Sequence, residues 1–264
     1  MTSAEIGVFG GSGLYAFLDD AEEVEVETPY GRPAAPVTIG TVGGRRVAFL
    51  PRHGRDHRFP PHVVPYRANV WAMKELGVTR LFAPSAAGSL RRDIPPRTFV
   101  VSDQAIDFTR SRQNTFYDGP TTTHVSFADP YCPVMRQVLV ERAGALGIDH
   151  RDGGTMVVIE GPRFSTRAES KMFTMVGGDV IGMTQFPEVT LARELELCFA
   201  NVALVTDYDV GVDDIAPVSH AEVLKVFGEN VDRLRDLLFA AIPAVPEDRD
   251  GCDCAHALGG SGHD

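Results

Sequence analysis

The stretch Val202-Ala-Leu-Val-Thr-Asp-Tyr-Asp-Val210 decides the fold class of this chain. Its apolar, β-branched start predicts a strand covered on both faces, and two carboxylates follow at the carboxyl end of that strand. Similar apolar runs predict strands at 6–9, 37–41, 47–50, 81–83, 99–102 and 156–159, and helical spacing predicts helices at 66–76, 133–146, 187–199 and 219–241. Strands that alternate with helices indicate an α/β fold: a single three-layer domain with a central mixed, largely parallel sheet flanked by helices.

Length and charge restrict the class of protein. The chain has 264 residues, enough for one large domain with its own core. Hydrophobic residues make up 44% of it, which excludes a disordered chain, a collagen and a coiled coil. The formal net charge of −11 disfavours nucleic acid and anionic membranes as partners. No stretch approaches the ~18–20 apolar residues of a membrane span, and no signal-peptide pattern begins the chain, so we predict a cytoplasmic protein.

We assign residues 1–243 to this domain and 244–264 to a flexible C-terminal tail that contains Cys252-Asp-Cys254. The cysteines, at 132, 198, 252 and 254, are too few and too unevenly spaced for a secreted disulfide scaffold. The tail cysteines and His256 fit zinc binding or a strained disulfide, but they fall short of a closed four-ligand site. We therefore expect a dispensable tail, and packed thiols at the other two cysteines.

A glycine turn follows the first predicted strand in Ile6-Gly-Val-Phe-Gly-Gly-Ser-Gly-Leu14. Gly11-x-Gly13-x-x-Ala16 formally fits the dinucleotide fingerprint, which also requires a helix, a second strand and an acidic residue soon afterwards. Acidic residues and turn formers at 19–33 follow instead, so the sequence disfavours this interpretation. A tight turn without a ligand is one alternative. We favour another, in which backbone amides and the Ser12 hydroxyl contact an anion.

Two further segments follow predicted strands. Arg52-His-Gly54 places a guanidinium and an imidazole before a glycine turn, which suits phosphate binding, whereas residues 55–58 are expected to form a solvated loop. Residues 83–90, Ala-Pro-Ser-Ala-Ala-Gly-Ser-Leu, form a predicted loop of small residues whose amides line a pocket. Because ligands of open α/β sheets bind beyond the carboxyl ends of the strands, we expect the three loops to converge.

Asp207 and Asp209 are the candidate acids. Residues two apart in an extended chain point the same way, and two carboxylates in one pocket raise each other's proton affinity. That property suits general acid chemistry. An acidic exit from a strand without chemical function is the alternative from these residues alone. The sequence contains neither Gly-x-Ser-x-Gly nor His-Glu-x-x-His, so serine hydrolases and zinc peptidases find no support.

Specific blocks of sequence occur along residues 5–243. They are Gly10-Gly-Ser-Gly-Leu14, Arg52-His-Gly54, Tyr66-Arg-Ala-Asn-Val-Trp-Ala72, Ala86-Ala-Gly-Ser-Leu90, Phe116-Tyr-Asp-Gly119, Gly154-Thr-Met-Val-Val-Ile-Glu-Gly-Pro-Arg-Phe-Ser165, Met183-Thr184, Pro187-Glu188 and Thr206-Asp-Tyr-Asp209. Together they resemble the trimeric nucleoside phosphorylase family, most closely the branch of it that acts on 5'-methylthioadenosine.

The resemblance implies where the ligands bind. The implied phosphate site consists of Ser12, Arg52, His53, Ser85, Ala86 and Thr184, and the implied purine site of Phe164, Ser165, Met183, Asp207 and Asp209. Serine stands at 12 and 85 where the family usually has threonine, and it keeps the hydroxyl. A homotrimer is implied, with a hexamer as the alternative, in which His124 of a neighbouring subunit closes the pocket. Phosphate is the expected co-substrate, and no metal or organic cofactor is expected.

The implied reaction is attack of phosphate on the anomeric carbon of a purine nucleoside. Asp207 is the expected general acid at purine N7, and Asp209 its support or the acceptor of a 6-amino group. The 6-oxopurine branch of the family usually has Asn at the first acid and Glu at the position of Ser165. The residues present here therefore predict a preference for 6-aminopurines, because a mismatch leaves buried polar groups unpaired.

The 5' substituent of the nucleoside is less well defined by the sequence. The family's methylthio pocket is apolar, commonly with Val near the start of the final helix, where this chain has His220. A histidine there binds a 5'-hydroxyl in ordinary purine nucleoside phosphorylases; an exposed helix residue is the alternative. Val223 and Leu224 are expected to supply apolar contact. 5'-Methylthioadenosine is thus the first expectation, and a 5'-hydroxyl purine nucleoside (adenosine or a 6-oxopurine nucleoside) the second.

Overall fold

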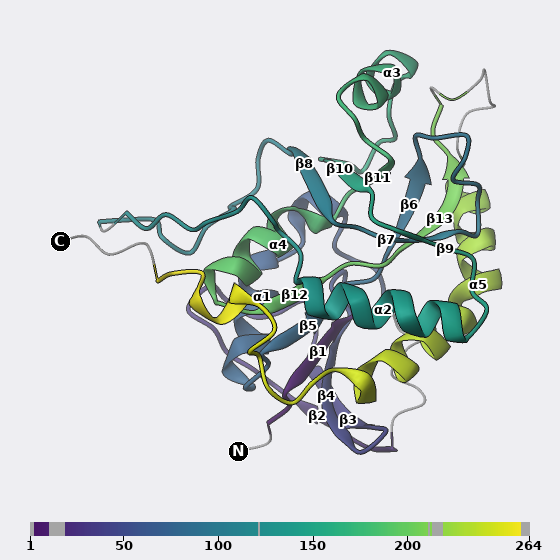
Figure 1. The fold of residues 1–264 in the computed structure, drawn as a ribbon. Coiled ribbons are helices and arrows are strands. Elements are labelled where there is room, and N and C mark those ends of the chain that lie inside the picture. Colours follow the sequence, from purple (N-terminus) through teal and green to yellow (C-terminus); the bar gives the residue numbers. More distant parts are fainter. Residues whose placement is uncertain (1–2, 11–18, 121, 211, 213–218, 260–264) are drawn as a thin grey trace.

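The computed structural model describes residues 3–10, 19–120, 122–210, 212 and 219–259. The helices are α1 (Tyr66–Glu75), α2 (Pro133–Ala145), α3 (Arg167–Met175), α4 (Gln185–Glu194) and α5 (His220–Ala241), with short 3-10 helices η2 (Pro61–Val63), η3 (Ile242–Ala244) and η4 (Asp253–His256). The strands are β1 (Ile6–Phe9), β2 (Asp19–Val24), β3 (Val37–Val42), β4 (Arg45–Leu50), β5 (Arg80–Phe82), β6 (Ser85–Ser89), β7 (Phe99–Val101), β8 (Gln104–Phe108), β9 (His150–Asp152), β10 (Thr155–Ile159), β11 (Val180–Gly182), β12 (Cys198–Ala200) and β13 (Ala203–Tyr208). The predicted α/β fold is confirmed (Figure 1).

The strands divide between two mixed sheets. One has the order β12-β5-β1-β4-β3-β2, parallel from β12 to β4 and antiparallel at β3 and β2. The other has the order β8-β10-β11-β6-β13-β7-β9, in which antiparallel pairs join three parallel segments. The described strands thus carry the expected mixture of parallel and antiparallel pairs.

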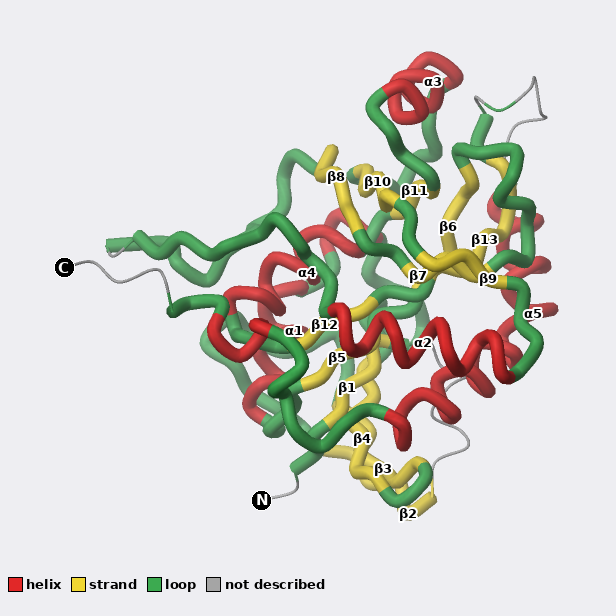
Figure 2. The backbone as a smooth tube through the Cα atoms, viewed as in Figure 1, coloured by secondary structure: helices red, strands yellow, loops and turns green. Residues whose placement is uncertain are grey.

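Helices cover both faces of the first sheet. On one face, side chains of β1, β3 and β4 such as Phe9 pack against α1 and α4, where Met73 and Leu191 are fully buried. On the other face, Ile6 and its neighbours pack against Leu139 of α2 and buried residues of α5. Strand residues that alternate between two apolar faces explain the uninterrupted apolar runs in the sequence. Figure 2 shows helices on both sides of these strands.

The two sheets are joined where paired strands bend together. β5 ends at Phe82 and the chain continues as β6 after two residues; β12 likewise continues as β13. Hydrogen bonds from Ala83 N to Ala200 O (2.9 Å) and from Ser85 N to Val202 O (3.1 Å) carry the pairing through the bend. Pro84 lacks an N–H group and so cannot continue a regular ladder. The bend leaves loop ends and strand ends of both sheets facing one space.

Three local predictions need correction. The helix predicted at 187–199 ends at Glu194, and its last part is strand β12. The acidic segment from Asp19 is an edge strand, β2, because an edge exposes charged side chains to water and to partners such as Arg46, 2.7 Å from Glu22. The small-residue segment after Pro84 is strand β6, since pairing with β11 and β13 outweighs its weak strand propensity.

Helix α3 was not predicted, although its N-terminus carries a recognisable signal. The Thr166 hydroxyl accepts a hydrogen bond from the backbone N–H of Glu169, and the Glu169 carboxylate accepts one from the backbone N–H of Thr166. This Thr-x-x-Glu capping box is a local signal, visible in the sequence, for the start of a helix. α3 stands out from the body beyond the ends of β10 and β11 (Figure 1).

The C-terminal segment is ordered differently from the expectation. Over the described part, residues 242–259 lie against the first sheet and α2, with Cys254 only 3% exposed. Arg80 donates hydrogen bonds to the carbonyls of Glu247 (2.5 Å) and Asp248 (2.6 Å). A buried side chain and hydrogen bonds to the backbone therefore hold the described part of the segment that we expected to be flexible. The helices that the structure describes include none with the length and apolar character to cross a membrane.

Candidate active site

A cavity of about 520 Å³ lies where the two sheets meet. Its size is typical of small-molecule sites. It is lined by residues of strand ends and adjoining loops, which include Arg52, His53, His57, Pro61, Ser85, Ala86, Gly88, Ile159, Phe164, Ser165, Met183, Thr184, Thr206, Asp207, Asp209, His220 and Val223. Residues from nearly the whole length of the chain therefore meet in one space.

One end of the cavity holds a buried ion pair. Arg52 follows β4, and its Nε and Nη2 donate to the two carboxylate oxygens of Glu188 at 2.6 and 3.2 Å. Arg52 is 6% exposed and Glu188 fully buried. Burial raises the pKa of Glu188, and the Arg52 guanidinium opposes that shift. The bidentate contact fixes the plane of the guanidinium.

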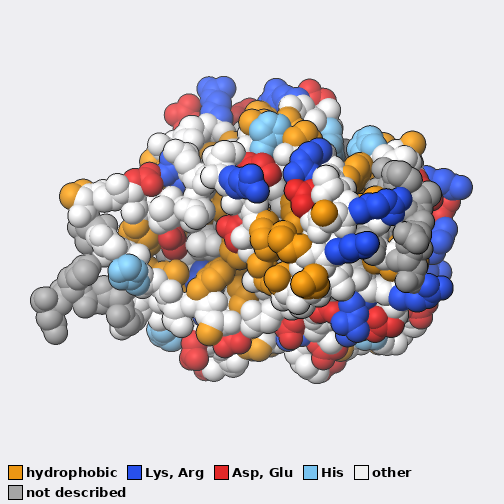
Figure 3. Space-filling view, turned by 90° about the horizontal axis from the view of Figure 1, so that it is seen from above, with side chains coloured by type: hydrophobic (Ala, Val, Ile, Leu, Met, Phe, Trp, Pro, Cys, Tyr) orange, Lys and Arg blue, Asp and Glu red, His pale blue; other side chains and the backbone are white. Residues whose placement is uncertain are grey.

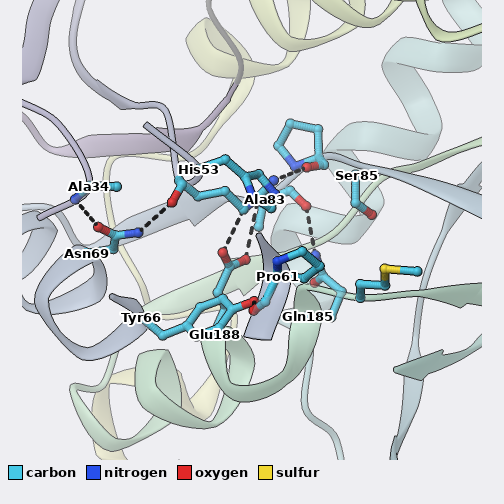
Figure 4. A network of polar contacts seen from close by, with 12 residues as sticks. Ala34, His53, Pro61, Tyr66, Asn69, Ala83, Ser85, Gln185 and Glu188 are labelled. Carbon is cyan, nitrogen blue, oxygen red and sulfur yellow. Dashed lines mark hydrogen bonds and ion pairs between the residues drawn. The ribbon is translucent and has the colours of Figure 1, made fainter. Parts of the chain in front are cut away.

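Further hydrogen bonds hold Arg52 in place. Its Nη1 donates to the carbonyl of Pro84 at 2.8 Å, which ties it to the bend between the sheets. The buried Asn69 of α1 donates to the carbonyl of Arg52 at 3.2 Å and accepts from the amide of Ala34 at 2.8 Å. Figure 4 shows this network. Among the described residues, these contacts leave one N–H on each terminal nitrogen of Arg52 for a ligand.

His53 lies beside this arginine as a neutral ring. Its Nδ1 is 2.8 Å from the carbonyl of Phe59, and because a carbonyl only accepts, Nδ1 carries the hydrogen. Burial, reinforced by the charge of Arg52, lowers the pKa of His53 to about 4. Nε2 is then an acceptor. The ring of His57 stacks on that of His53, with 4.7 Å between the ring centroids, and lines the cavity. Residues 55–58 are exposed, as expected of a solvated loop.

Hydroxyl groups complete this end of the cavity. Ser85 begins β6 and accepts a hydrogen bond from Asn201 Nδ2 at 3.1 Å; the same amide nitrogen donates to Ala83 O at 2.9 Å. Ala86 follows in β6. Thr184 precedes α4, and its side chain makes no capping hydrogen bond to the helix. Its hydroxyl is thus not used by the helix it precedes, and it faces the cavity.

The two aspartates lie at the other end, since Asp207 pairs with Gly88 of β6, three residues beyond Ser85. Asp207 is the penultimate residue of β13, and its Oδ2 accepts a hydrogen bond from Thr206 Oγ1 at 2.7 Å. Burial raises the pKa of Asp207 to about 6, the Thr206 hydroxyl opposes the shift, and the charges of Asp209 and Glu222 add to it. A proton on Asp207 is therefore accessible near neutral pH, as a general acid requires.

Asp209 has a carboxylate oxygen that lacks a regular hydrogen bond to the described residues. It is 3% exposed and burial raises its pKa, opposed chiefly by a hydrogen bond with Ser170. Ser165 lies close enough to Asp209 to oppose this rise in pKa as well. Neither Asp209 Oδ2 nor Ser165 Oγ, however, forms a hydrogen bond of regular geometry with another described residue. Such atoms are costly unless a ligand completes them.

A glycine on the adjacent strand makes room for these carboxylates. A Cβ at Gly88 would lie 3.1 Å from Asp207 Oδ1 and 3.7 Å from Asp209 Cβ. Any side chain at this position would therefore press on the first acid. The motif that contains Gly88 carries no local signal for this close approach, because Asp207 is more than a hundred residues away in the chain.

Arg112 positions the loops that carry Phe164 and Met183, two apolar side chains that line the cavity. Its side chain is 1% exposed and donates to the carbonyls of Met183 (2.7 Å), Ile159 (3.2 Å) and Glu160 (2.6 Å), and to that of Phe186. One guanidinium thus fixes the loops on which Met183 and Phe164 approach the cavity. The sequence carries no local signal for this role, because the contacts span more than forty positions.

Most of the predicted site residues meet in this cavity. Those that line it are Arg52, His53, Ser85, Ala86, Phe164, Ser165, Met183, Thr184, Asp207, Asp209, His220 and Val223. Leu224 is 56% exposed and does not line it, because successive residues of α5 point about 100° apart and the one that faces the cavity is Val223. His124 is exposed on the loop between β8 and α2 and does not line the cavity of its own chain. Ser12 lies outside the described residues.

A paired cation at one end of a cavity and an accessible proton at the other define a class of enzyme. Arg52 and the neutral His53 suit an incoming anion, and Asp207 suits a leaving group that must gain a proton. An enzyme that has both of these features can transfer a group from the leaving group to the incoming anion.

The chain belongs to the phosphorylase superfamily, whose sequence model matches residues 5–243. This match confirms the prediction of a nucleoside phosphorylase, a pentosyltransferase. The chain is similar to the S-methyl-5'-thioadenosine phosphorylase of Pyrococcus abyssi, with 54% identity over 254 residues that cover 96% of this chain and 97% of the relative.

Two further similarities bear on the substrate. The purine nucleoside phosphorylase of Streptomyces coelicolor is 53% identical over 267 residues, which cover 97% of this chain and 95% of the relative. The crystal structure of methylthioadenosine phosphorylase from Schistosoma mansoni in complex with adenine is 35% identical. It superimposes with a TM-score of 0.90 and covers 97% of both chains.

Proposed function

We propose that this enzyme cleaves 5'-methylthioadenosine with inorganic phosphate, releasing adenine and 5-methylthioribose 1-phosphate. The high identity to a full-length relative of that specificity supports this substrate. The observation that carries the proposal is the cavity itself, in which Arg52 and His53 lie at one end and Asp207 and Asp209 at the other. Phosphate is the co-substrate, and the reaction requires neither a metal nor an organic cofactor.

Phosphate binds at the arginine end. The two N–H groups of Arg52 that Glu188 and Pro84 leave free donate to phosphate oxygens. Nε2 of the neutral His53 accepts a hydrogen bond from a protonated phosphate oxygen. The hydroxyls of Ser85 and Thr184 donate further hydrogen bonds, and the amide of Ala86 lies beside them. Because Arg52 is fixed by its partners, phosphate is positioned without reordering the protein.

The purine binds at the aspartate end. Phe164 and Met183 supply the apolar faces for the ring. Oδ2 of Asp209 accepts from the 6-amino group of adenine, and the hydroxyl of Ser165 gains a partner on the base. A 6-oxopurine presents an acceptor at that position, so two acceptors would face each other. The crystal structure of the Schistosoma mansoni relative with adenine supports this preference.

The chemistry follows from these positions. A phosphate oxygen forms a bond to C1' of the sugar as the C1'–N9 bond breaks, and the bonding electrons depart with the purine. Asp207 donates its proton to N7, so that the base leaves neutral; the elevated pKa makes this proton available. The cationic end of the cavity stabilises the anion on the opposite side of the sugar.

A 5'-hydroxyl nucleoside is the second candidate substrate. His220 lines the cavity at the start of α5, where an imidazole can hydrogen-bond a hydroxyl, whereas Val223 one turn on is apolar. The purine nucleoside phosphorylase of Streptomyces coelicolor, similar over the whole chain, supports this alternative. Both candidates use the same phosphate and purine sites.

We further propose a homotrimer in which His124 of one subunit closes the cavity of the next, with a hexamer as the alternative assembly. Apolar side chains on and after α3 are exposed, Met175 by 84% and Val176 by 50%, and suit a subunit contact. Figure 3 views the molecule from above, the side on which Figure 1 shows α3, and hydrophobic side chains gather on that face. The loop that carries His124 extends beyond the body (Figure 2).

The test is a substrate panel with and without phosphate. We expect phosphate-dependent release of adenine from 5'-methylthioadenosine, slower turnover of adenosine, and weak activity on inosine, guanosine and methylthioinosine. Base release that is equally fast without phosphate would identify a nucleosidase and overturn the role of Arg52. Faster turnover of adenosine than of 5'-methylthioadenosine would favour the second candidate.

A further inference from the structure

All four cysteines of the chain converge at one place outside the cavity. The Sγ atoms of Cys132, Cys198, Cys252 and Cys254 lie within 4.8 Å of one another, and those of Cys198 and Cys252 are 3.6 Å apart. None of the four lines the cavity proposed to bind substrate. Three are almost completely buried, and Cys252 is partly buried. This four-cysteine cluster has no role in the chemistry proposed above.

The fold brings the cluster together from three segments. Cys132 is the residue before α2, and its amide donates to the carbonyl of Phe199 at 2.8 Å, which places it beside Cys198 at the start of β12. The other two come from the C-terminal segment, which returns to the same sheet. Arg80 binds the carbonyls of Glu247 and Asp248 there, and η4 begins at Asp253.

The geometry matches tetrahedral coordination by sulfur. Four sulfurs at 2.3 Å from a zinc ion lie about 3.8 Å from one another, and the spread within the cluster is close to this value. Two disulfides would instead draw the sulfurs into pairs about 2 Å long. In the structure all four sulfurs lie within 4.8 Å of one another, and all four are free thiols.

The surroundings suit a negatively charged metal site. Four thiolates and one divalent zinc carry a net charge of −2, which is costly to bury without nearby cations. Arg193 Nη1 lies 3.7 Å from Cys254 Sγ, and Arg249 lines the same small cavity as Cys132, Cys198 and Cys252. Two arginines that are not themselves ligands of the proposed site therefore lie beside the cluster.

We propose that the four-cysteine cluster binds one zinc ion in a structural site. The ion ties the C-terminal segment to β12 and to the start of α2, and because four thiolates fill its coordination it leaves no position for a substrate. His256 is not among the clustered ligands, so the Cys-Cys-His arrangement considered from sequence is replaced by four sulfurs. Metal binding then contributes directly to the stability of this part of the fold.

The first test is metal content. Enzyme produced in medium containing zinc and purified without chelator should hold about one zinc per chain by elemental analysis. After zinc is exchanged for Co²⁺, the protein should show the visible absorption of tetrahedral cobalt with thiolate charge-transfer bands. Removal of the metal by a chelator should lower the Tm by about 5 °C or more. Four free thiols without metal, or two disulfides by mass spectrometry of alkylated, unreduced protein, would overturn the proposal.

Variants locate the site. Cys252→Ser/Cys254→Ser should reduce the zinc content at least about tenfold, since half of the ligands are lost. Asp253→Asn and His256→Ala alter the same segment without removing a sulfur, and should keep full zinc content. A full complement of zinc in the double serine variant would overturn the proposal. If that variant folds poorly, the cobalt spectrum of the unmodified enzyme remains decisive.

Discussion

The two ends of the cavity differ in how far the protein satisfies their polar groups. At the arginine end, the Arg52 guanidinium is held by Glu188 and Pro84, and the His53 ring by Phe59. At the aspartate end, Asp209 Oδ2 and Ser165 Oγ lack a regular hydrogen bond to the described residues, and Asp207 holds a proton more tightly than usual.

This difference separates binding from chemistry. An anion is bound best by a cation whose position is already fixed, because the protein then loses little freedom on binding. A leaving base is helped best by a group whose protonation can change, and burial makes the ionised state of Asp207 less favourable. We expect substitutions at the arginine end to affect phosphate, and those at the aspartate end to affect the base and the pH dependence.

Arg52→Ala should have the largest effect. It removes donors that bind phosphate and leaves Glu188 as an unpaired buried charge. We expect kcat/KM for phosphate to fall by about 10⁴ and the free energy of unfolding to fall by about 3–5 kcal/mol. Steady-state kinetics and thermal denaturation measure the two effects.

A double variant separates these effects of Arg52→Ala. Arg52→Met/Glu188→Leu removes both charges and should recover much of the lost stability while remaining inactive. If the double variant regains phosphate turnover, Arg52 does not bind the anion.

Asp207→Asn should have the next largest effect. Its activity should fall, whereas its stability should rise. Turnover of 5'-methylthioadenosine should fall by about 10³, because the general acid is lost, and inosine should be relatively favoured. The folded-state pKa, about 6 against the ordinary 3.8, means that Asp207 lowers stability progressively as pH rises between these values. Allowing for partial exposure of the group, the asparagine variant should be about 2 kcal/mol more stable at pH 7.5. An unchanged base preference would remove Asp207 from base selection.

Glu188→Gln should act through the position of Arg52. The amide keeps the shape of the carboxyl group but loses its charge and one acceptor. We expect KM for phosphate to rise about tenfold to a hundredfold with kcat less affected. Glu188→Asp should restore part of the loss, and an equal loss for adenine-nucleoside binding would contradict a role confined to the phosphate end.

The pH profile of kcat/KM should show one falling limb, caused by a titrating group at the aspartate end of the cavity. With phosphate saturating at each pH, kcat/KM for 5'-methylthioadenosine should fall about tenfold per unit as pH rises above the pKa of Asp207, about 6. His53 should add no limb in this range, since its pKa is about 4 and its ring is neutral throughout. The same falling limb in Asp207→Asn would assign the proton to another group.

His220→Val should have the smallest effect and tests the boundary between the two candidate substrates. Replacing the imidazole at the start of α5 by an apolar group should raise the ratio of kcat/KM for 5'-methylthioadenosine over adenosine by about tenfold. Lys225→Val, on the same helix but outside the cavity lining, is the matched control. Equal losses on both nucleosides would mean that His220 does not contact the 5' group.

Much of the site could be predicted from the sequence because its residues follow buried strands. A strand end fixes where the next side chains can point, so Arg52 after β4 and Asp207 in β13 are indicated by local pattern alone. Sequence patterns predict secondary structure less well where a strand consists of small residues, as in β6, and where a helical pattern continues past the end of a helix, as after α4. In both regions the outcome depended on pairing with distant strands.

The sequence by itself determined the α/β architecture, the strand-end position of the candidate residues and the resemblance to nucleoside phosphorylases. Only the tertiary structure decided that Glu188, 136 residues away, holds Arg52, that His57 stacks on His53, and that four cysteines gather in one cluster. The physical reason is that periodicity and capping act over a few residues. An ion pair or a metal site depends on distances that exist only after the sheets have packed.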